Sequence, residues 1–160
     1  AHRSDDGSED RFASPLEARK KAMDFLARRE YGQVELIRNL ADKGFERDVA
    51  EAAVTRLTGD GLQSDERFAE SFVQSRINQG KGPVRIRLEL SQRDIQDSTI
   101  ETAIGACDAD SRRLARDVRL RKFGGQRPAD FKARARQMRF LQYRGFEPDQ
   151  VQAAVSSFDE

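Results

Sequence analysis

Apolar residues recur along the chain with the spacing of amphipathic α-helices, and the alternation typical of a β-strand is nowhere sustained. One arrangement returns about every 50 residues: a leucine, then Gly or Asp followed by Phe or Ile, then Ala followed by Val or Ile. Three segments carry it in one register without a gap: Leu40–Val54, Leu90–Ile104 and Leu141–Val155. The pattern therefore predicts an all-α chain of three tandem repeats.

Another amphipathic helix lies upstream of each of these segments, so each repeat is expected to hold three helices. The predicted repeats span 15–61, 64–106 and 109–158, and residues 1–13 are expected to be a flexible polar tail. A unit of about 45 residues buries little surface by itself. We therefore expect the repeats to pack in series as an elongated, curved array.

Residues that favour helix ends support these boundaries. Helix starts are predicted at Ser14-Pro15, Gly32, Ser64, Gly82-Pro83 and Ser98, with Glu17 and Glu101 completing capping boxes. Asp65 and Glu66 are interpreted as first-turn carboxylates that favour the helix dipole. Gly44 and Gly145 are predicted to end helices in the left-handed conformation. The repeated apolar positions are interpreted as core.

The residue inventory argues against catalysis. Cys107 is the only cysteine and His2 the only histidine, which removes disulfides and Cys/His metal sites and leaves the thiol without a base. Gly80-Lys81-Gly82 lacks the spacing of a phosphate-binding loop and is interpreted as a turn between helices. We expect no enzyme activity, no cofactor and no metal.

No stretch approaches the roughly 20 apolar residues that span a bilayer. With 36% charged residues, the chain is expected to be a soluble, cytoplasmic monomer with long exposed helices. Its net charge of +1 is unevenly placed, because residues 111–144 hold 12 Lys and Arg against 2 Asp and Glu. The chain therefore combines a strongly basic segment with an acidic remainder.

Within the basic segment, four residues recur at i, i+4, i+7 and i+11 of a predicted helix: Lys132, Arg136, Arg139 and Tyr143. Their face differs from the apolar one predicted for Phe131, Ala135, Met138 and Leu141. A second basic row is predicted for Arg112, Arg116 and Arg119, and a smaller patch for Arg76, Lys81, Arg85 and Arg87. Such rows either neutralise phosphates, meet an acidic protein surface, or are simply solvated.

The sequence resembles the RecX regulatory proteins of bacteria from about residue 18 to the end of the third repeat. The middle repeat carries the most specific block: Asp65-Glu66-Arg67-Phe68-Ala69, then Arg76, then Gly80-x-Gly82-Pro83-x2-Ile86-x3-Leu90. Further blocks are Phe25-Leu26-Ala27-Arg28-Arg29-Glu30 with Glu35-Leu36, Lys122-Phe123-Gly124, and Arg139-Phe140-Leu141-x2-Arg144-Gly145-Phe146. Two departures are Gly32, where the family commonly has a Ser-type cap, and Asp94, where a Gly usually ends the helix.

The resemblance implies a helical protein that binds the RecA filament on single-stranded DNA, enters its groove, and inhibits or remodels it. RecA ATPase, strand exchange and SOS coprotease activity would fall, which places the chain in DNA repair and homologous recombination. Candidate contacts are Arg76, Lys81, Arg85, Lys132, Arg136, Arg139 and Tyr143. Arg67 and Arg144 are alternatively interpreted as braces at helix ends.

Two other function classes stay open from the residues. A direct DNA-binding protein would use the basic face of the third repeat, because short three-helix units with a basic helix resemble helix-turn-helix modules. A general helical scaffold would bind some other protein and ignore RecA. Sensitivity of binding to salt separates bare-DNA binding from a preference for RecA-coated DNA.

Overall fold

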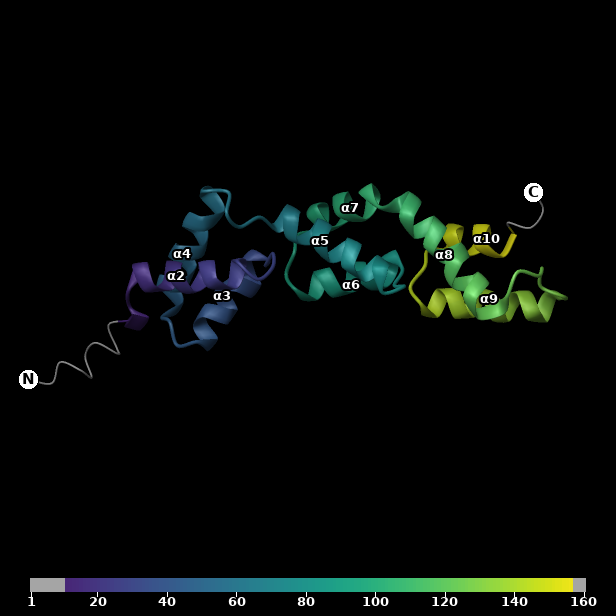
Figure 1. Ribbon diagram of the computed structural model, residues 1–160, viewed down its shortest axis with the longest axis horizontal. Coiled ribbons are helices and arrows are strands. Elements are labelled where there is room, and N and C mark those ends of the chain that lie inside the picture. Colours follow the sequence, from purple (N-terminus) through teal and green to yellow (C-terminus); the bar gives the residue numbers. More distant parts are fainter. Residues whose placement is uncertain (1–10, 157–160) are drawn as a thin grey trace, which may run out of the picture. The chain divides into compact units, whose positions relative to one another are not determined.

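A computed structural model describes residues 11–156, and all regular secondary structure in that range is α-helical (Figure 1). The prediction of an all-α chain is thus confirmed for these residues. The chain divides into two compact units: unit 1 is Ala1–Ala69 with Arg93–Ile95, and unit 2 is Glu70–Gln92 with Gln96–Glu160. Residues 1–10 of the predicted tail and the last two residues of the predicted third repeat lie outside the described residues.

Unit 1 contains α2 (Pro15–Leu26), α3 (Gln33–Asp42) and α4 (Arg47–Gly59), and each of these helices packs on the other two. Their inward faces form one core that includes Ala18, Ala22, Phe25, Leu36, Leu40, Ala50, Val54 and Leu57. Phe12, which falls in the predicted tail, packs on this core with its ring centroid 5.4 Å from that of Phe45. The first predicted repeat is therefore a three-helix bundle.

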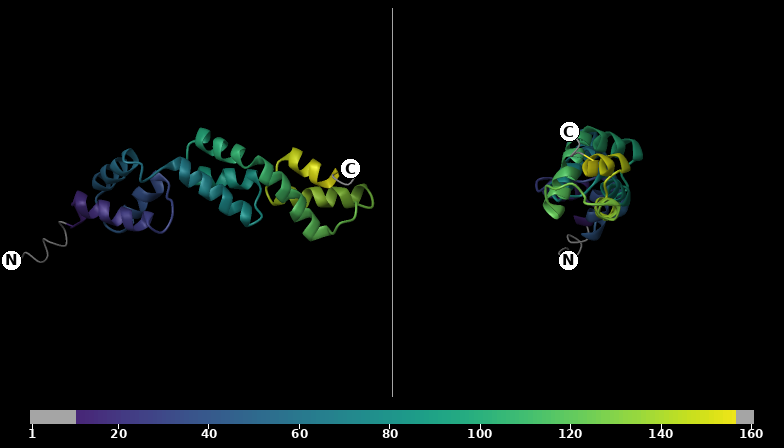
Figure 2. Two further views of the ribbon diagram at one scale, coloured as in Figure 1. Left: turned by 45° about the horizontal axis from the view of Figure 1, so that its top comes forward. Right: turned by 90° about the vertical axis from the view of Figure 1, so that its right-hand side faces the viewer.

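α5 (Asp65–Asn78) begins in unit 1 and ends in unit 2. Unit 2 continues with α6 (Pro83–Gln92), α7 (Asp97–Ala106), α8 (Asp108–Phe123), α9 (Phe131–Tyr143) and α10 (Pro148–Ser156). α6 packs on α7, whereas α8, α9 and α10 pack on one another (Figure 1 and the left view of Figure 2). The repeated leucines Leu40, Leu90 and Leu141 are fully buried, as their register predicted.

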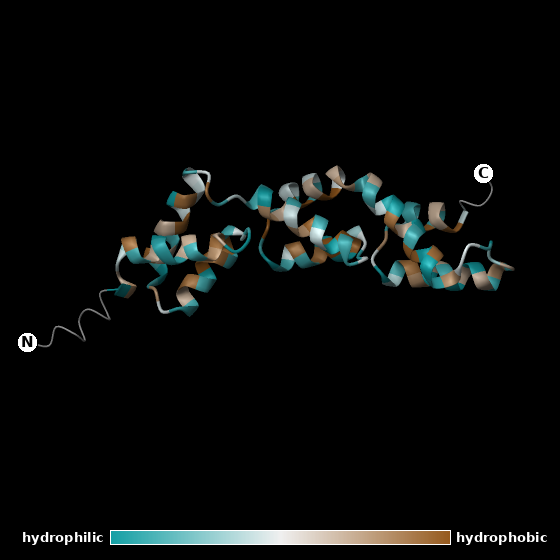
Figure 3. Ribbon diagram, in the orientation of Figure 1, coloured by the Kyte–Doolittle hydropathy of each residue, from teal (hydrophilic) through white to brown (hydrophobic). Residues whose placement is uncertain are grey.

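Hydrophobic and hydrophilic residues alternate along the helices and no helix is hydrophobic throughout (Figure 3). This distribution follows from bundles of three helices, because each helix buries one stripe and exposes the rest. No helix within residues 11–156 combines the length and the hydrophobicity needed to cross a membrane.

Most predicted helix ends are confirmed. The Ser14 hydroxyl accepts a hydrogen bond from Glu17 N at 3.2 Å, and the Ser64 hydroxyl accepts one from Arg67 N at 3.2 Å. Asp94 has φ +60°, close to the left-handed values typical of a helix-ending residue. The capping box predicted at Ser98 is wrong, because α7 begins at Asp97 with Gln96 as its N-cap.

The start of α3 shows how unit 1 compensates for Gly32, which has no side chain to cap a helix. Asp65 Oδ1 accepts a hydrogen bond from Gln33 N at 2.8 Å and another from Gln63 Nε2 at 3.0 Å. Asp65 therefore caps α3 from 32 residues away, in addition to its place in the first turn of α5. The missing local cap is supplied by the next repeat's motif.

A second long-range contact joins repeats 2 and 3 inside unit 2, and we call residues 80–83 with 144–147 the junction. Gly82 N donates to the Arg144 carbonyl at 2.9 Å, and Val84 N donates to the Gly145 carbonyl at 2.8 Å. The first amides of α6 are thus satisfied by the last carbonyls after α9. A Cβ on Gly82 would lie 2.4 Å from the Gly145 carbonyl carbon, so only glycine fits. Two of the segments that resemble the family, residues 80–83 and residues 144–146, are therefore in direct contact.

Candidate partner-binding surface

Two of the predicted contact residues are engaged inside the fold. Arg76 Nε lies 2.9 Å from Glu89 Oε1, and Lys81 Nζ lies 3.3 Å from Glu89 Oε2. Arg76 also lies over the Phe72 ring, 4.1 Å from its centroid. Burial alone would raise the pKa of Glu89, but the hydrogen bonds from Arg76 and Lys81 outweigh it and lower that pKa. Arg76 and Lys81 are therefore both paired with the Glu89 carboxylate.

Other charges around the junction are also paired. Arg87 lies 3.0 Å from Glu147 and also pairs with Glu101. The hydrogen bond to Glu101 is the main reason that the Arg87 pKa is raised. In unit 1, Arg67 Nε lies 3.0 Å from Glu30 Oε2, which confirms its interpretation as a brace.

Arg85 and Tyr143 are brought together, as members of α6 and α9. The Arg85 guanidinium lies 5.4 Å from the centroid of the Tyr143 ring, and 74% of Tyr143 is exposed. Val84 and Leu88 on α6 are exposed as well, at 47% and 60%. This edge of unit 2 combines aromatic, aliphatic and cationic groups, a mixture enriched in protein interfaces.

The predicted row Lys132, Arg136 and Arg139 exists on the surface of α9. All three side chains are exposed and line a hollow of about 280 Å³ together with Asp130 and Ala133. Asp130 is the N-cap of α9 and accepts a hydrogen bond from Ala133 N at 2.8 Å. Among residues 11–156, no ion pair or hydrogen bond engages the three cations. We call Lys132, Arg136 and Arg139 the α9 row.

The second basic row predicted on α8 is wrong. Arg119 is only 2% exposed, and it donates to Gln137 Oε1 at 2.9 Å and to the Gln126 carbonyl at 2.6 Å. Burial lowers its pKa. Arg112 pairs with both Asp108 and Asp149. The prediction is wrong because α9 covers Arg119. The spacing of residues along α8 alone does not reveal this contact.

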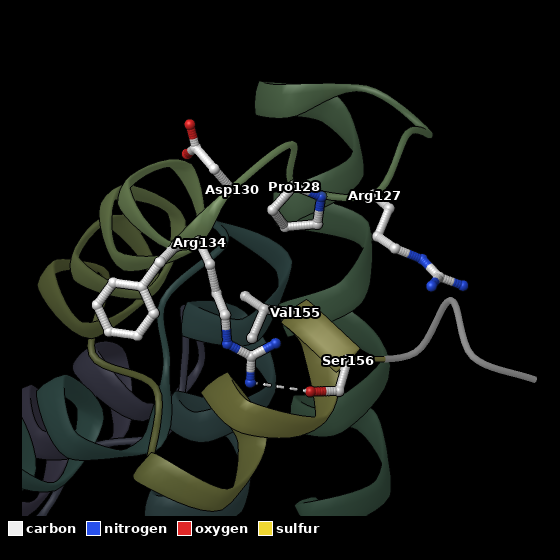
Figure 4. A pocket seen from close by; sticks show the side chains of 7 residues that line it. Arg127, Pro128, Asp130, Arg134, Val155 and Ser156 are labelled. Atoms are coloured by element: carbon white, nitrogen blue, oxygen red, sulfur yellow. Dashed lines mark hydrogen bonds between the residues drawn. The ribbon is translucent and has the colours of Figure 1, made fainter.

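The prediction for Phe131 is also wrong, because this residue was expected on the buried face of its helix and is 85% exposed. It is the first residue of α9, where the helix extends beyond the core formed by Leu141 and its neighbours. Phe131 borders a hollow of about 350 Å³ whose lining also includes Arg127, Pro128, Asp130, Arg134, Val155 and Ser156. Arg134 points toward Ser156 and donates to its hydroxyl at 3.1 Å (Figure 4).

Two further features bear on the chemistry of the described residues. Residues 11–156 hold no group of three or more His, Cys, Asp or Glu side chains suited to a metal. Cys107 is half-buried, and burial, with lesser effects of Asp110 and Glu70, raises the pKa of its thiol. A raised pKa disfavours the thiolate that a nucleophile needs.

Comparison with known proteins places all three repeats in one family. The models of the first, second and third three-helix domains of RecX match residues 18–57, 64–104 and 110–155. A protein of Pseudomonas fluorescens named "Regulatory protein RecX" is 49% identical over 138 residues, which is 86% of this chain and 89% of that protein. A protein of the same name from Pseudomonas putida is 45% identical, covering 91% of this chain and 94% of the relative.

Solved structures show the same fold. The crystal structure of RecX from Lactobacillus salivarius superposes with a TM-score of 0.77 at 20% identity, covering 91% of this chain and 96% of that chain. A second structure, titled "Crystal structure of regulatory protein RecX", has a TM-score of 0.73 at 23% identity, covering 88% of this chain and 70% of that chain. At these identities the likeness concerns the fold alone.

Proposed function

This chain belongs to the RecX family of regulatory proteins, and from that premise we propose that it binds and restrains RecA filaments on single-stranded DNA. It docks in the filament groove and inhibits or remodels the filament, which lowers RecA ATPase, strand exchange and SOS coprotease activity. It acts as a cytoplasmic monomer and as a regulator without enzyme activity of its own. RecA as the partner comes from the family resemblance.

The observation that supports a docking role most directly is the α9 row. Lys132, Arg136 and Arg139 are exposed cations without partners among the described residues, so their charge is available to another molecule. Exposed rows of one sign accelerate association by steering, and several weak contacts along a repetitive filament add up to strong binding. Arg85 and Tyr143 extend this surface on the same unit.

Arg76 and Lys81 have a different role in this proposal. Their charges are largely neutralised by Glu89, so breaking those pairs to reach a partner would leave a part-buried carboxylate alone. We assign Arg76 and Lys81 to the fold of repeat 2, and the α9 row with Arg85 and Tyr143 to partner binding.

The test is single-stranded-DNA-dependent ATP hydrolysis by RecA with substoichiometric amounts of this protein. We expect inhibition at doses too low to coat the DNA, and about 100-fold weaker inhibition when Lys132, Arg136 and Arg139 are all changed to Glu. The matched control changes Arg28, Lys43 and Arg56 of unit 1 to Glu, three exposed cations that also have no ion pair among the described residues, so net charge changes equally. If both triple variants inhibit alike, the α9 row has no docking role.

Direct binding to bare DNA is the second candidate, and the α9 row favours it too. For a protein that neutralises phosphates, the logarithm of the binding constant falls linearly with the logarithm of the salt concentration. On single strands the slope is about −0.7 for each phosphate neutralised. Affinity for bare DNA that falls steeply with salt, with no effect on RecA, would make this function primary. A marked preference for RecA-coated DNA would instead support the filament proposal.

A further inference from the structure

The start of α9 presents an aromatic ring to solvent beside basic side chains. Phe131 is 85% exposed, more than any other large hydrophobic residue of the described chain. It borders the hollow of about 350 Å³, which lies at the small end of the ~300–1,000 Å³ range of ligand pockets. A core role does not explain this ring, because the α8–α10 core is formed without it.

The chemistry around the ring is predominantly cationic. Arg127 and Arg134 are both among the lining residues, and the Arg134 guanidinium points toward Ser156, to whose hydroxyl it donates a hydrogen bond (Figure 4). Asp130 is the one carboxylate in that lining, and its side chain points away from Arg134 and caps α9. The site therefore suits a ligand that carries both a flat apolar face and negative charge.

The same carboxylate also borders the hollow lined by the α9 row, so the two hollows meet at Asp130. Phe131 and the cations Lys132, Arg136 and Arg139 therefore border two hollows that share one lining residue at the start of α9. A ligand whose flat group rests on Phe131 would place neighbouring negative charges along that row.

We infer that this surface binds single-stranded nucleic acid, with one unpaired base stacked on Phe131 and the adjoining phosphates against the α9 row. In a duplex both faces of a base are covered by its neighbours, so an isolated ring gains nothing from it. An unpaired base offers a free face, and stacking on an aromatic side chain tolerates any sequence. Acidic side chains of a protein would pair with the cations but would not by themselves supply a flat apolar group for the ring. Phe131 is thus the residue that separates single strands from duplex.

The first experiment uses fluorescence. The chain contains no tryptophan, so Phe131→Trp introduces a single reporter at the site. We expect oligo(dT) to quench this emission, and an oligomer of the same length with abasic sugars at every position to leave it nearly unchanged. Equal responses to both oligomers would overturn the stacking role, because they share phosphates and differ only in bases.

The second experiment measures affinity by anisotropy of labelled oligomers. Phe131→Ala is expected to weaken oligo(dT) binding by about 5- to 50-fold and to leave binding of the abasic oligomer and of duplex within about twofold. Leu120→Ala, which removes another exposed apolar side chain of the same unit, is the matched control. Phe131→Tyr should retain tight binding. An unchanged affinity of Phe131→Ala for oligo(dT) would contradict the proposal.

This inference deepens the second candidate function, direct binding to DNA, on which it rests, and it does not depend on RecA. Both experiments contain only this protein and an oligomer, so their failure leaves filament inhibition untouched. Conversely, loss of the RecA effect with intact stacking would remove the filament proposal alone. Binding of oligo(dT) that survives Phe131→Ala but disappears on reversing the α9 row would show that only phosphates are bound and that the ring is idle.

Discussion

The junction and the α9 row both hold conspicuous cations of unit 2, yet they use the charge in opposite ways. At the junction, Arg76 and Lys81 share Glu89, and Arg87 binds Glu101 and Glu147. Along the α9 row, no carboxylate or hydrogen-bond acceptor of residues 11–156 engages Lys132, Arg136 or Arg139. Positive charge therefore organises the fold in one place and is free for a partner in the other.

The difference has a simple cause. Residues 131–144 contain no Asp or Glu, so none of Lys132, Arg136 and Arg139 has a carboxylate three or four residues away in the helix. The cations near the junction pair with carboxylates that lie 8 to 60 residues away in the chain. These carboxylates come close to the cations only when the chain folds. Counting basic residues cannot distinguish the two sets, whereas locating the nearest carboxylate can.

Removing the glycine contact at the junction should have the largest effect on stability. Gly82→Ala places a Cβ 2.4 Å from the Gly145 carbonyl carbon, and we expect the free energy of unfolding to fall by about 2–3 kcal/mol. Gly105→Ala in α7 is the control, since nothing lies within 4 Å of its Cβ, and it should add up to about 1 kcal/mol. Urea unfolding measures both changes in unfolding free energy. Equal changes in the two variants would show that the junction accommodates a Cβ at residue 82.

Removing the shared carboxylate should cost less. Glu89→Ala leaves Arg76 and Lys81 part-buried without it, so we expect unfolding free energy to fall by about 1–2 kcal/mol. Glu51→Ala is the control, because its pair with Arg47 is exposed on both sides and should be worth less than about 0.5 kcal/mol. Denaturant titrations in which the two variants match would mean that the Glu89 pairs contribute no more than surface pairs.

The same carboxylate predicts a pH dependence. Its pKa in the folded chain is lowered from the ordinary value of 4.5, so the folded state binds its proton less readily than the unfolded state. The stability from Glu89 should be fully present above that ordinary value and lost as pH falls through the lowered one. The difference in unfolding free energy between the natural chain and Glu89→Gln should therefore shrink as the pH falls below 4.5. A difference that grows on acidification would reverse the sign and refute this assignment.

The smallest effects, and the sharpest contrast, come from single neutral substitutions. Arg136→Gln should weaken RecA-filament binding by about threefold, because it removes one of the three charges of the α9 row. The melting temperature should not change, because an exposed, unpaired cation contributes well under about 1 kcal/mol to the stability of the fold. Arg76→Gln should lower the melting temperature and leave filament affinity of the folded fraction unchanged. The reverse pattern would exchange the roles of the junction and the α9 row.

Much of the fold could be predicted from the sequence. The helical register of Leu40, Leu90 and Leu141 identified the repeats, because periodic burial is written into consecutive residues. Caps such as Ser14 and Ser64 and the positive φ of Gly44 and Gly145 were also predicted, since each depends on neighbours within one turn. The exposed α9 row was visible for the same reason.

The tertiary structure decided everything that depends on contacts between repeats or between helices. It buried Arg119 under α9, left Phe131 in solvent, and moved Arg76 and Lys81 onto Glu89. It also joined Asp65 to the start of α3, and Gly82 to Gly145. The sequence by itself determined which residues form helices and which stripe of each is apolar, because those properties are local. Which cations near the junction are paired with carboxylates was decided only by folding, because those carboxylates come from distant parts of the chain.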